Sequence, residues 1–273
     1  MTILAGKKGL IMGVANNRSI AWGITQECKK YGAELAFTYQ GDALKKRVEP
    51  LAASVGSDTV LECDVTDENS VKAVFVELEK KWGKLDFVVH AIAYSDKEEL
   101  RGKYLDTSPK NFAQTLNISA YSLAMVARHA EPLLKKAEDG GSIVTLSYYG
   151  AEKVMPHYNV MGVAKAALEA SVKYLAMDMG KDNIRVNSIS AGPVKTLAAS
   201  GIGDFRLIFK WNEYNAPLRR NITLKEVGGA AVFLLSELGG GVTGENLHVD
   251  AGYHVVGMKA PDAPDLSIIR EEK

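Results

Sequence analysis

The sequence has little of the chemistry that marks several common protein classes. Its 273 residues include only two cysteines, Cys28 and Cys63, which form no C-x-x-C pair. This excludes a disulfide scaffold and a cysteine zinc site, and it is typical of a reducing cytoplasm. Lysine plus arginine equals aspartate plus glutamate at 33 each, so the zero net charge provides no electrostatic basis for binding nucleic acid.

Long apolar runs and metal-ligand motifs are missing as well. No apolar run approaches the roughly 18 residues that a membrane span needs. The five histidines are scattered and form no H-x-x-x-H pair, so we expect no metal site. The chain reaches Gly13, where a motif begins, too early to leave room for a signal peptide. We therefore expect a soluble, cytoplasmic protein without a membrane span.

Short apolar runs alternate with longer amphipathic segments along most of the chain. The apolar runs predict buried strands and the amphipathic segments predict helices. Strands are predicted at 9–14, 34–39, 59–63, 85–91, 142–147, 184–189 and 247–249. Helices are predicted at 19–31, 42–54, 66–82, 109–136 and 158–179. The alternation indicates the α/β class, with a single doubly wound parallel sheet and helices on both faces.

The chain shows no break in composition until its polar end. We predict one domain over residues 1–258, followed by a loosely held polar tail at 259–273. Residues 190–220 interrupt the alternation, since they combine glycines, a proline and an apolar patch at 205–209. A long irregular segment inside a compact domain is often a lid, and we predict that role here. The apolar run 230–235 fits either the core or an interface.

The first predicted strand runs directly into Gly13 and then into a helix that Ser19 is predicted to cap. The unpaired N–H groups and the positive dipole end of such a helix favour a dinucleotide pyrophosphate. The spacing does not match G-x-G-x-x-G, so a plain strand-to-helix turn remains an alternative.

Residues at the ends of the next strands help to identify the dinucleotide that binds. Gln40 stands where an acidic residue would bind ribose hydroxyls and an arginine would bind a 2′-phosphate. Its neutral amide favours NAD over NADP, although basic residues at 45–47 lie nearby. Asp64 ends the third strand, where it contacts the adenine edge or serves only as a turn carboxylate. Ile92, after the fourth strand, is typical of a core residue, and His90, on that strand, is typical of a structural residue.

Tyr158 and Lys165 are seven residues apart at the start of a predicted helix. Two helical turns bring them to one face. An adjacent ammonium lowers the pKa of a tyrosine, so this pair can donate a proton or a hydrogen bond. An amphipathic helix with a surface tyrosine and lysine has the same spacing and remains the alternative.

Three segments, at 13–21, 158–162 and 190–198, together carry a resemblance to a known family. The short-chain dehydrogenase/reductase superfamily typically has Tyr-x-x-x-Lys, with a serine seventeen residues before the lysine. Counted from Lys165, those positions hold Met161 and Tyr148, and the tyrosine lies one turn earlier at Tyr158. In this departure the chain resembles the bacterial enoyl-acyl-carrier-protein reductases, over residues 4–258.

The resemblance implies a Rossmann-type fold and a reaction. The family reduces the trans-2 double bond of an acyl chain carried as a thioester on acyl carrier protein, the last reductive step of each elongation cycle in fatty acid synthesis. Hydride passes from NADH, preferred over NADPH, to the β-carbon, and negative charge develops on the thioester oxygen. Stabilising that oxygen is the main electrostatic task of such a site.

The resemblance also implies residue roles. Tyr158 hydrogen-bonds the thioester oxygen, Lys165 holds the nicotinamide ribose, and Tyr148 lines the pocket and assists proton transfer. The implied cofactor-binding residues are Gly13, Ser19, Ile20, Gln40, Asp64, Val65, Ile92, Lys165, Val194, Lys195, Thr196, Leu197 and Ala198. The implied substrate-binding residues are Ser95, Met161, Ile202 and Phe205. Plain helix packing is the alternative role for Phe205.

The lid departs from the family where the acidic carrier protein docks. Relatives often place lysines around its Asp-Phe-Arg, whereas here Gly203 and Leu207 flank it and only Arg206 and Lys210 are basic. The docking residues therefore stay open. The family is typically a homotetramer, which we also expect here.

Two other functions fit parts of the sequence. One is a carbonyl or alcohol reductase of the same fold, against which Met161 and Tyr148 argue. The other is a non-enzymatic dinucleotide sensor, which would need the cofactor loop but neither Tyr158 nor Lys165.

Overall fold

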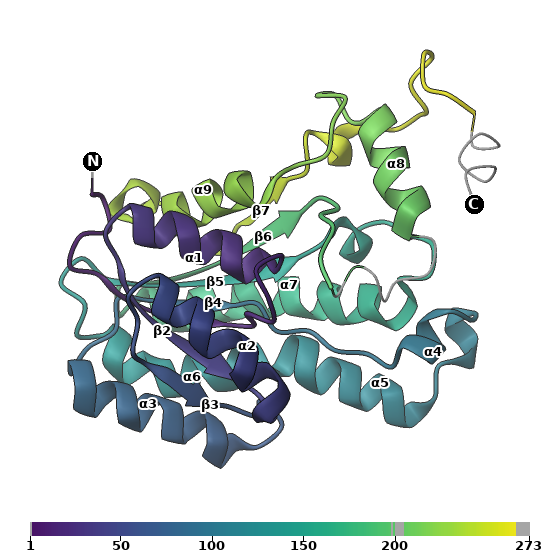
Figure 1. Ribbon diagram of the computed structural model, residues 1–273. Helices are drawn as coiled ribbons and strands as arrows, with labels where there is room; N and C mark the ends of the chain where they lie inside the picture. The colour runs from purple at the N-terminus through teal and green to yellow at the C-terminus, as the bar shows by residue number, and fades with distance from the viewer. Residues whose placement is uncertain (1, 198, 200–204, 266–273) are drawn as a thin grey trace.

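The computed structural model describes residues 2–197, 199 and 205–265, whose strands form one seven-stranded parallel sheet (Figure 1). The strand order is β3-β2-β1-β4-β5-β6-β7 and all neighbours pair in parallel. The chain thus winds outward in both directions from the β1–β4 pair, which leaves a crevice at the carboxyl ends of those strands. The strands are β1 (Lys8–Met12), β2 (Glu34–Tyr39), β3 (Val60–Glu62), β4 (Phe87–His90), β5 (Gly141–Ser147), β6 (Ile184–Ala191) and β7 (Asn246–Val249).

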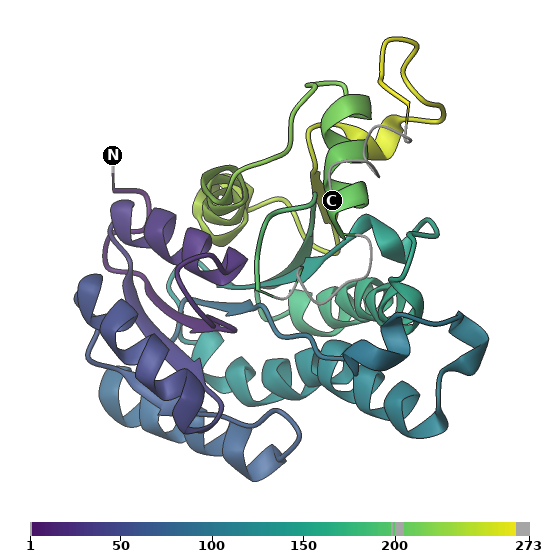
Figure 2. The same cartoon turned by 45° about the vertical axis from the view of Figure 1, so that its right-hand side comes forward.

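Helices cover both faces of the sheet (Figures 1 and 2). One core contains side chains of α3, α6 and α7, and the other contains side chains of α1, α2 and α9. Along β1, Leu10 points into the first core and Ile11 into the second, and both are fully buried. A strand covered on both sides needs apolar residues at consecutive positions, which explains the unbroken apolar runs. These six helices are α1 (Ile20–Lys30), α2 (Gly41–Ser54), α3 (Glu68–Trp82), α6 (Ser122–Leu134), α7 (Asn159–Gly180) and α9 (Leu224–Leu235).

Most of the shorter elements gather at the carboxyl end of the sheet (Figure 1). The predicted helical region 109–136 consists of α5, a π-helical turn and α6 in direct succession. The remaining helices are α4 (Lys97–Leu100), α5 (Pro109–Leu116), α8 (Phe205–Asn215), the π-turn η2 (Asn117–Tyr121) and the 3₁₀ turns η1 (Tyr104–Asp106), η3 (Tyr149–Ala151), η5 (Glu237–Gly239) and η6 (Tyr253–Val255). The predicted α/β class and doubly wound parallel sheet are confirmed.

Residues 190–220, predicted to be a long irregular segment, contain the helix α8 over Phe205–Asn215. Ile208, Asn212 and Asn215 are buried one or two turns apart, so the helix presents one face to the protein. The apolar run 230–235 lies in α9 and contributes mainly to the core. Thr223 and Glu226 form a capping box at the start of that helix.

The tail that follows residue 258 makes specific contacts in its described part. The Ala260 amide donates to Asn215 Oδ1 at 2.8 Å, and Lys259 pairs with Asp265 at 2.7 Å. Within the described residues, no helix is both long enough and apolar enough to cross a bilayer.

Candidate active site

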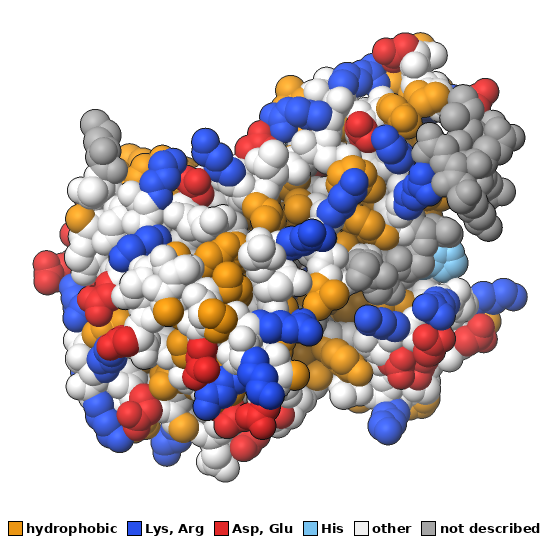
Figure 3. All heavy atoms as spheres, in the orientation of Figure 1, with side chains coloured by type: hydrophobic (Ala, Val, Ile, Leu, Met, Phe, Trp, Pro, Cys, Tyr) orange, Lys and Arg blue, Asp and Glu red, His pale blue; other side chains and the backbone are white. Residues whose placement is uncertain are grey.

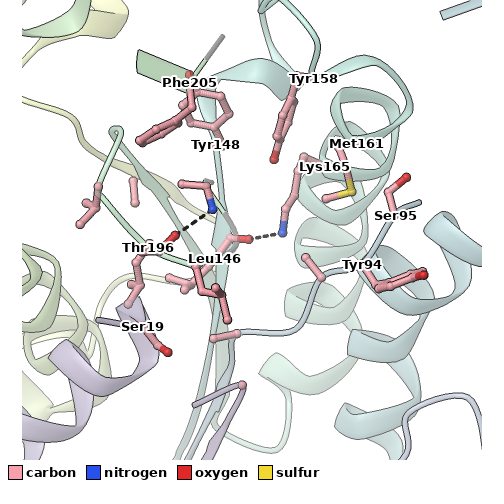
Figure 4. Close-up of a pocket in the computed structure, with 18 of the residues that line it drawn as sticks. Ser19, Tyr94, Ser95, Leu146, Tyr148, Tyr158, Met161, Lys165, Thr196 and Phe205 are labelled. Carbon is pink, nitrogen blue, oxygen red and sulfur yellow. Dashed lines mark hydrogen bonds between the residues drawn. The ribbon is translucent and has the colours of Figure 1, made fainter. Parts of the chain in front are cut away.

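A cavity of about 620 Å³ opens at the carboxyl ends of β1, β4, β5 and β6 (Figure 4). Its walls come from the β1–α1 turn, the segment after β4, the start of α7, the segment after β6 and the start of α8. Figure 3 shows hydrophobic side chains gathered in this hollow, with lysine and arginine side chains around it. The crevice predicted by the strand order is therefore a real cavity.

The β1–α1 turn depends on a glycine. Gly13 has φ +97°, and a Cβ there would stand 2.0 Å from the Ala91 carbonyl oxygen on the neighbouring chain segment. Ser19 is the N-cap residue of α1, as predicted, but its side chain makes no capping hydrogen bond. Its Oγ instead accepts hydrogen bonds from the Ala15 and Asn16 amides, both at 3.0 Å, and so shapes the turn.

The positive end of α1 opens onto the cavity through Ser19 and Ile20, which both line it. Gly23 lies one turn further along, where a Cβ would come within 2.7 Å of Leu224 Cβ, so α1 can approach α9 closely. A glycine cradle, a helix N-terminus and close helix packing are what a dinucleotide pyrophosphate requires. These residues therefore fit such a cofactor.

Gln40, Asp64 and Val65 lie at the ends of β2 and β3, outside the cavity lining. Asp64 Oδ1 accepts hydrogen bonds from both the amide and the hydroxyl of Thr66, at 2.8 and 2.7 Å. This carboxylate therefore stabilises the turn that follows β3. Burial acts to raise the Asp64 pKa, but hydrogen bonds from Thr66 and Gln40 outweigh it and hold the pKa below its ordinary value. Gln40 and Asp64 thus face each other, while Val65 is part of the core.

Tyr148 directly follows β5 and Tyr158 directly precedes α7. Their rings meet edge to face, with centroids 5.0 Å apart and planes at 77°. The Tyr158 hydroxyl points into the cavity between Tyr148 and Lys165 (Figure 4). Burial raises the pKa of both tyrosines. Both are therefore neutral phenols at pH 7.

The prediction that Lys165 lowers the Tyr158 pKa is wrong in this structure. Burial raises it, and Tyr148 and Glu169 raise it further. Lys165 is itself only 6% exposed, and its Nζ donates to the Leu146 carbonyl oxygen at 2.6 Å. Burial lowers the pKa of Lys165 to about 8, while the Glu169 charge acts in the opposite direction. The ammonium form is therefore easily lost above neutral pH.

The apolar side of the cavity includes Met161, Phe205 and Ile208. Met161 Sδ receives a 3.8 Å contact from the Ser119 hydroxyl in the π-turn. The Phe205 ring lies 5.9 Å from that of Phe209 and also lines the cavity, so helix packing is not its only role.

The segment after β4 contributes every residue from 91 to 98 to the cavity lining. Ser119 holds it in place by accepting from the Tyr94 amide at 2.9 Å and donating to the Tyr94 carbonyl at 3.0 Å. Ser95 is buried, and its Oγ accepts from the Thr115 hydroxyl at 3.0 Å and from the Asn111 side-chain amide at 3.2 Å. The π-turn and α5 therefore fix the wall opposite the tyrosines.

The cavity brings together most of the residues singled out in the sequence, and Ile92 both lines it and packs against the core. The predicted site residues that line it are Gly13, Ser19, Ile20, Ile92, Ser95, Tyr148, Tyr158, Met161, Lys165, Val194, Thr196, Leu197 and Phe205. Lys195 does not line it, since its Nζ lies 4.7 Å from the centre of the Phe209 ring. Ala198 and Ile202 lie outside the described residues.

Sequence reasoning missed several lining residues, among them Tyr94, Asp96, Leu100 and Ile208. Three of them follow β4, the strand beside β1 at the reversal of strand order, and that position alone would have indicated them. His90 has the structural role predicted for it. It is fully buried between Thr145 Oγ1 at 3.0 Å and Ser122 Oγ at 2.8 Å, and burial lowers its pKa to about 3.

Comparison with known proteins agrees with this geometry. Residues 13–254 match the family model described as enoyl-(acyl carrier protein) reductase. The chain is 66% identical to enoyl-acyl-carrier-protein reductase (NADH) 1 of Rhizobium meliloti, over 98% of each chain. A crystal structure of the reductase from Anaplasma phagocytophilum in complex with NAD is 62% identical, with a TM-score of 0.91 over 95% of this chain and 98% of that one.

A crystal structure of the Bacillus cereus reductase with NADP⁺ and indole naphthyridinone is 50% identical, with a TM-score of 0.91 over 94% of this chain and 100% of that one. These similarities extend over nearly the whole chain, and the matched range 13–254 spans the segments that form the cavity. The chain therefore belongs to the enoyl-acyl-carrier-protein reductase family of the short-chain dehydrogenases/reductases.

Proposed function

We propose that this protein is an NADH-dependent enoyl-acyl-carrier-protein reductase, which saturates trans-2-enoyl thioesters in fatty acid elongation. The observation that carries the proposal is one apolar cavity onto which the glycine turn of β1, the Tyr158 hydroxyl and the Lys165 ammonium all open. NADH supplies the hydride that the β-carbon of the substrate accepts.

The cofactor-binding residues lie along the carboxyl edge of the sheet. The turn at Gly13, with Ser19 and Ile20, holds the pyrophosphate. Gln40 binds the adenosine ribose with a neutral amide, and Asp64 and Val65 bound the adenine. At the other end, Ile92 and Lys165 hold the nicotinamide ribose region, and residues 194–198 cover it.

Tyr158 donates a hydrogen bond to the thioester oxygen as negative charge develops there. A neutral phenol is the form that can donate, and burial keeps Tyr158 in that form. Lys165 adds positive potential near the same oxygen, and the Leu146 carbonyl fixes its ammonium. Tyr148 supports the Tyr158 ring from the side, lines the pocket and assists proton transfer.

Met161 and Phe205 contact the acyl chain, and Ser95, which lies beside Met161 in the cavity wall, contacts the substrate (Figure 4). The same role is proposed for Ile202, which lies outside the described residues. Met161 and Tyr148 occupy the positions at which carbonyl reductases of this fold carry their tyrosine and serine. Without those two groups the site is poorly equipped to take a carbonyl to an alcohol, which favours reduction of the double bond.

The organisation of the protein follows from the same proposal. Residues 1–258 form one reductase domain with a lid over residues 190–220, and it works in the cytoplasm on acyl carrier protein. The assembly is a homotetramer, as the exposed Tyr174 and Met177 on α7 support, at 77% and 82% exposure. Large apolar side chains at this exposure suit a contact between copies.

Transfer of an isotope tests the reaction directly. The protein is incubated with NADH that carries deuterium at both C4 positions and with a trans-2-enoyl acyl carrier protein, and the product is analysed by mass spectrometry and NMR. We expect a saturated acyl chain with one deuterium at the β-carbon. An unreduced substrate, or deuterium at any other carbon, contradicts the proposal.

A further inference from the structure

Two side chains of α7, one helical turn apart, contact consecutive residues at the end of β5. Lys165 Nζ donates to the Leu146 carbonyl at 2.6 Å, as Figure 4 shows, and Glu169 accepts a hydrogen bond from the Ser147 hydroxyl. Ser147 is only 5% exposed and lines the cavity beside Tyr148. The contacts therefore join the helix that carries Lys165 to the strand end that carries Tyr148.

Glu169 also lies on the same face of α7 as Lys165, since residues four apart on a helix are neighbours. It is half-buried, so its charge is less screened by water than that of a surface carboxylate. Its charge raises the pKa of both Lys165 and Tyr158. A negative charge there favours the ammonium of Lys165 and disfavours the phenolate of Tyr158.

Resting on the proposed function, we propose that Glu169 is a positioning residue of the reductase site, which fixes the end of β5 through Ser147 and keeps Lys165 in its ammonium form. No step of the reaction uses Glu169 directly, because it is not among the residues that line the cavity. It acts through the charge of Lys165 and the placement of Tyr148.

The charged and titratable neighbours of Glu169 and Lys165 determine which group a pH experiment follows. Glu169 faces Ser147 on β5, Glu152 after η3, His248 on β7 and Lys173 on α7. Burial raises the Glu169 pKa, Ser147 and the two basic groups act to lower it, and Glu152 acts to raise it.

Lys165 faces Glu169 on its own helix and His90 on β4, and that imidazole is neutral at any working pH because burial lowers its pKa to about 3. Glu169 is therefore the charged group whose removal most directly changes the protonation of Lys165.

The test is the pH dependence of kcat/KM for an enoyl thioester, in the full-length protein. Glu169→Gln removes the charge, keeps the shape and still offers a carbonyl oxygen to Ser147. We expect the basic limb, which begins near the Lys165 pKa of about 8 in the wild type, to move to lower pH by about one pH unit. The pH at which NADH binding weakens, measured by fluorescence without substrate, moves in the same direction.

Asp178→Asn is the matched control, because it removes one carboxylate from an exposed position on the same helix. We expect its basic limb to coincide with that of the wild type. Glu169→Asp keeps the charge but shortens the side chain, so its limb stays in place while kcat falls severalfold. This variant also decides the question if Glu169→Gln does not fold.

A basic limb of Glu169→Gln that coincides with the wild type overturns the proposal, as does a limb of Glu169→Asp that moves. Neither result touches the proposed function, which fails only if the wild type itself does not reduce the enoyl substrate.

Discussion

Tyr158→Phe removes one hydroxyl from the cavity and leaves in place the ring that packs edge to face against Tyr148. The ring also fills space beside Gly150, where a Cβ would come within 2.4 Å of Tyr158 Cδ1, so the phenylalanine keeps those contacts. No apolar packing is lost, and we expect the free energy of unfolding to change by no more than about 1 kcal/mol.

The expected loss appears in turnover. Tyr158 is the donor proposed for the thioester oxygen, and removing one such donor typically lowers kcat by roughly 10²–10³-fold, or about 3–4 kcal/mol of transition-state stabilisation. The glycine turn at Gly13 is unchanged, so the KM for NADH should stay within about threefold. The neutral state of Tyr158 predicts in addition that the wild-type reaction shows no acid limb from this group.

The assay follows the loss of NADH absorbance with a trans-2-enoyl thioester, alongside thermal denaturation of each variant. Tyr149→Phe is the matched control. It removes the hydroxyl of the neighbouring tyrosine, which donates to the His254 carbonyl at 3.3 Å outside the cavity lining. If Tyr158→Phe turns over as fast as Tyr149→Phe, Tyr158 is not the oxyanion donor and the reasoning is refuted.

Three further predictions concern the cofactor turn, the ribose and the buried lysine. Gly13→Ala should destabilise the fold by at least about 2 kcal/mol and abolish NADH binding, because its Cβ would overlap the Ala91 carbonyl at a φ of +97°; an unchanged melting temperature contradicts this. Gln40→Arg should raise kcat/KM for NADPH relative to NADH, and an unaltered ratio means that Gln40 does not contact the ribose. Lys165→Met should abolish turnover yet raise stability at pH 7 by up to roughly 3 kcal/mol, measured by urea denaturation. The direction of this stability change follows from the lowered pKa. A lysine in the unfolded protein, with its ordinary pKa of 10.5, holds its proton more tightly than the buried Lys165, so the charge of Lys165 destabilises the folded protein. The stability gained by removing Lys165 should therefore shrink as the pH rises above 8.

The fold was predictable from the sequence because its strands are covered on both sides. Consecutive apolar residues such as Leu10 and Ile11 point to opposite cores, so each strand appears as an unbroken apolar run. The helix at 205–215 was missed because the glycines and the proline that precede it made the whole stretch 190–220 look like one irregular segment.

The reactive centre was predictable because its residues are close in sequence. Tyr158 directly precedes α7 and Lys165 lies two turns along it, so their spacing predicted a shared face, with a plain amphipathic helix as the alternative. Tyr148 was singled out by its place in the family resemblance. The pKa of Tyr158 was not predictable. The direction of its shift is set by burial in the folded protein, and Tyr148 and Glu169 raise the pKa further.

The wall formed by residues 91–98 could be predicted as a whole only from the order of the strands. The resemblance had implied Ile92 and Ser95, but the other residues of this wall carry no motif, and they face the cavity because β4 lies beside β1. Likewise, Lys195 shared a segment with cavity-lining neighbours, but its long side chain reaches the Phe209 ring instead. Tertiary packing therefore decides whether such a side chain lies in solvent, against an aromatic ring or in the cavity.

The central claim is that this cavity reduces a carbon–carbon double bond and not a carbonyl. The most direct measurement is NADH oxidation by the purified wild type with a trans-2-enoyl thioester and, in parallel, with a 3-ketoacyl thioester of the same chain length. The account predicts rapid oxidation with the enoyl substrate and none above background with the ketoacyl substrate. Oxidation with the ketoacyl substrate alone would contradict it, and would mean that Tyr148 and Met161 do not distinguish this site from a carbonyl reductase.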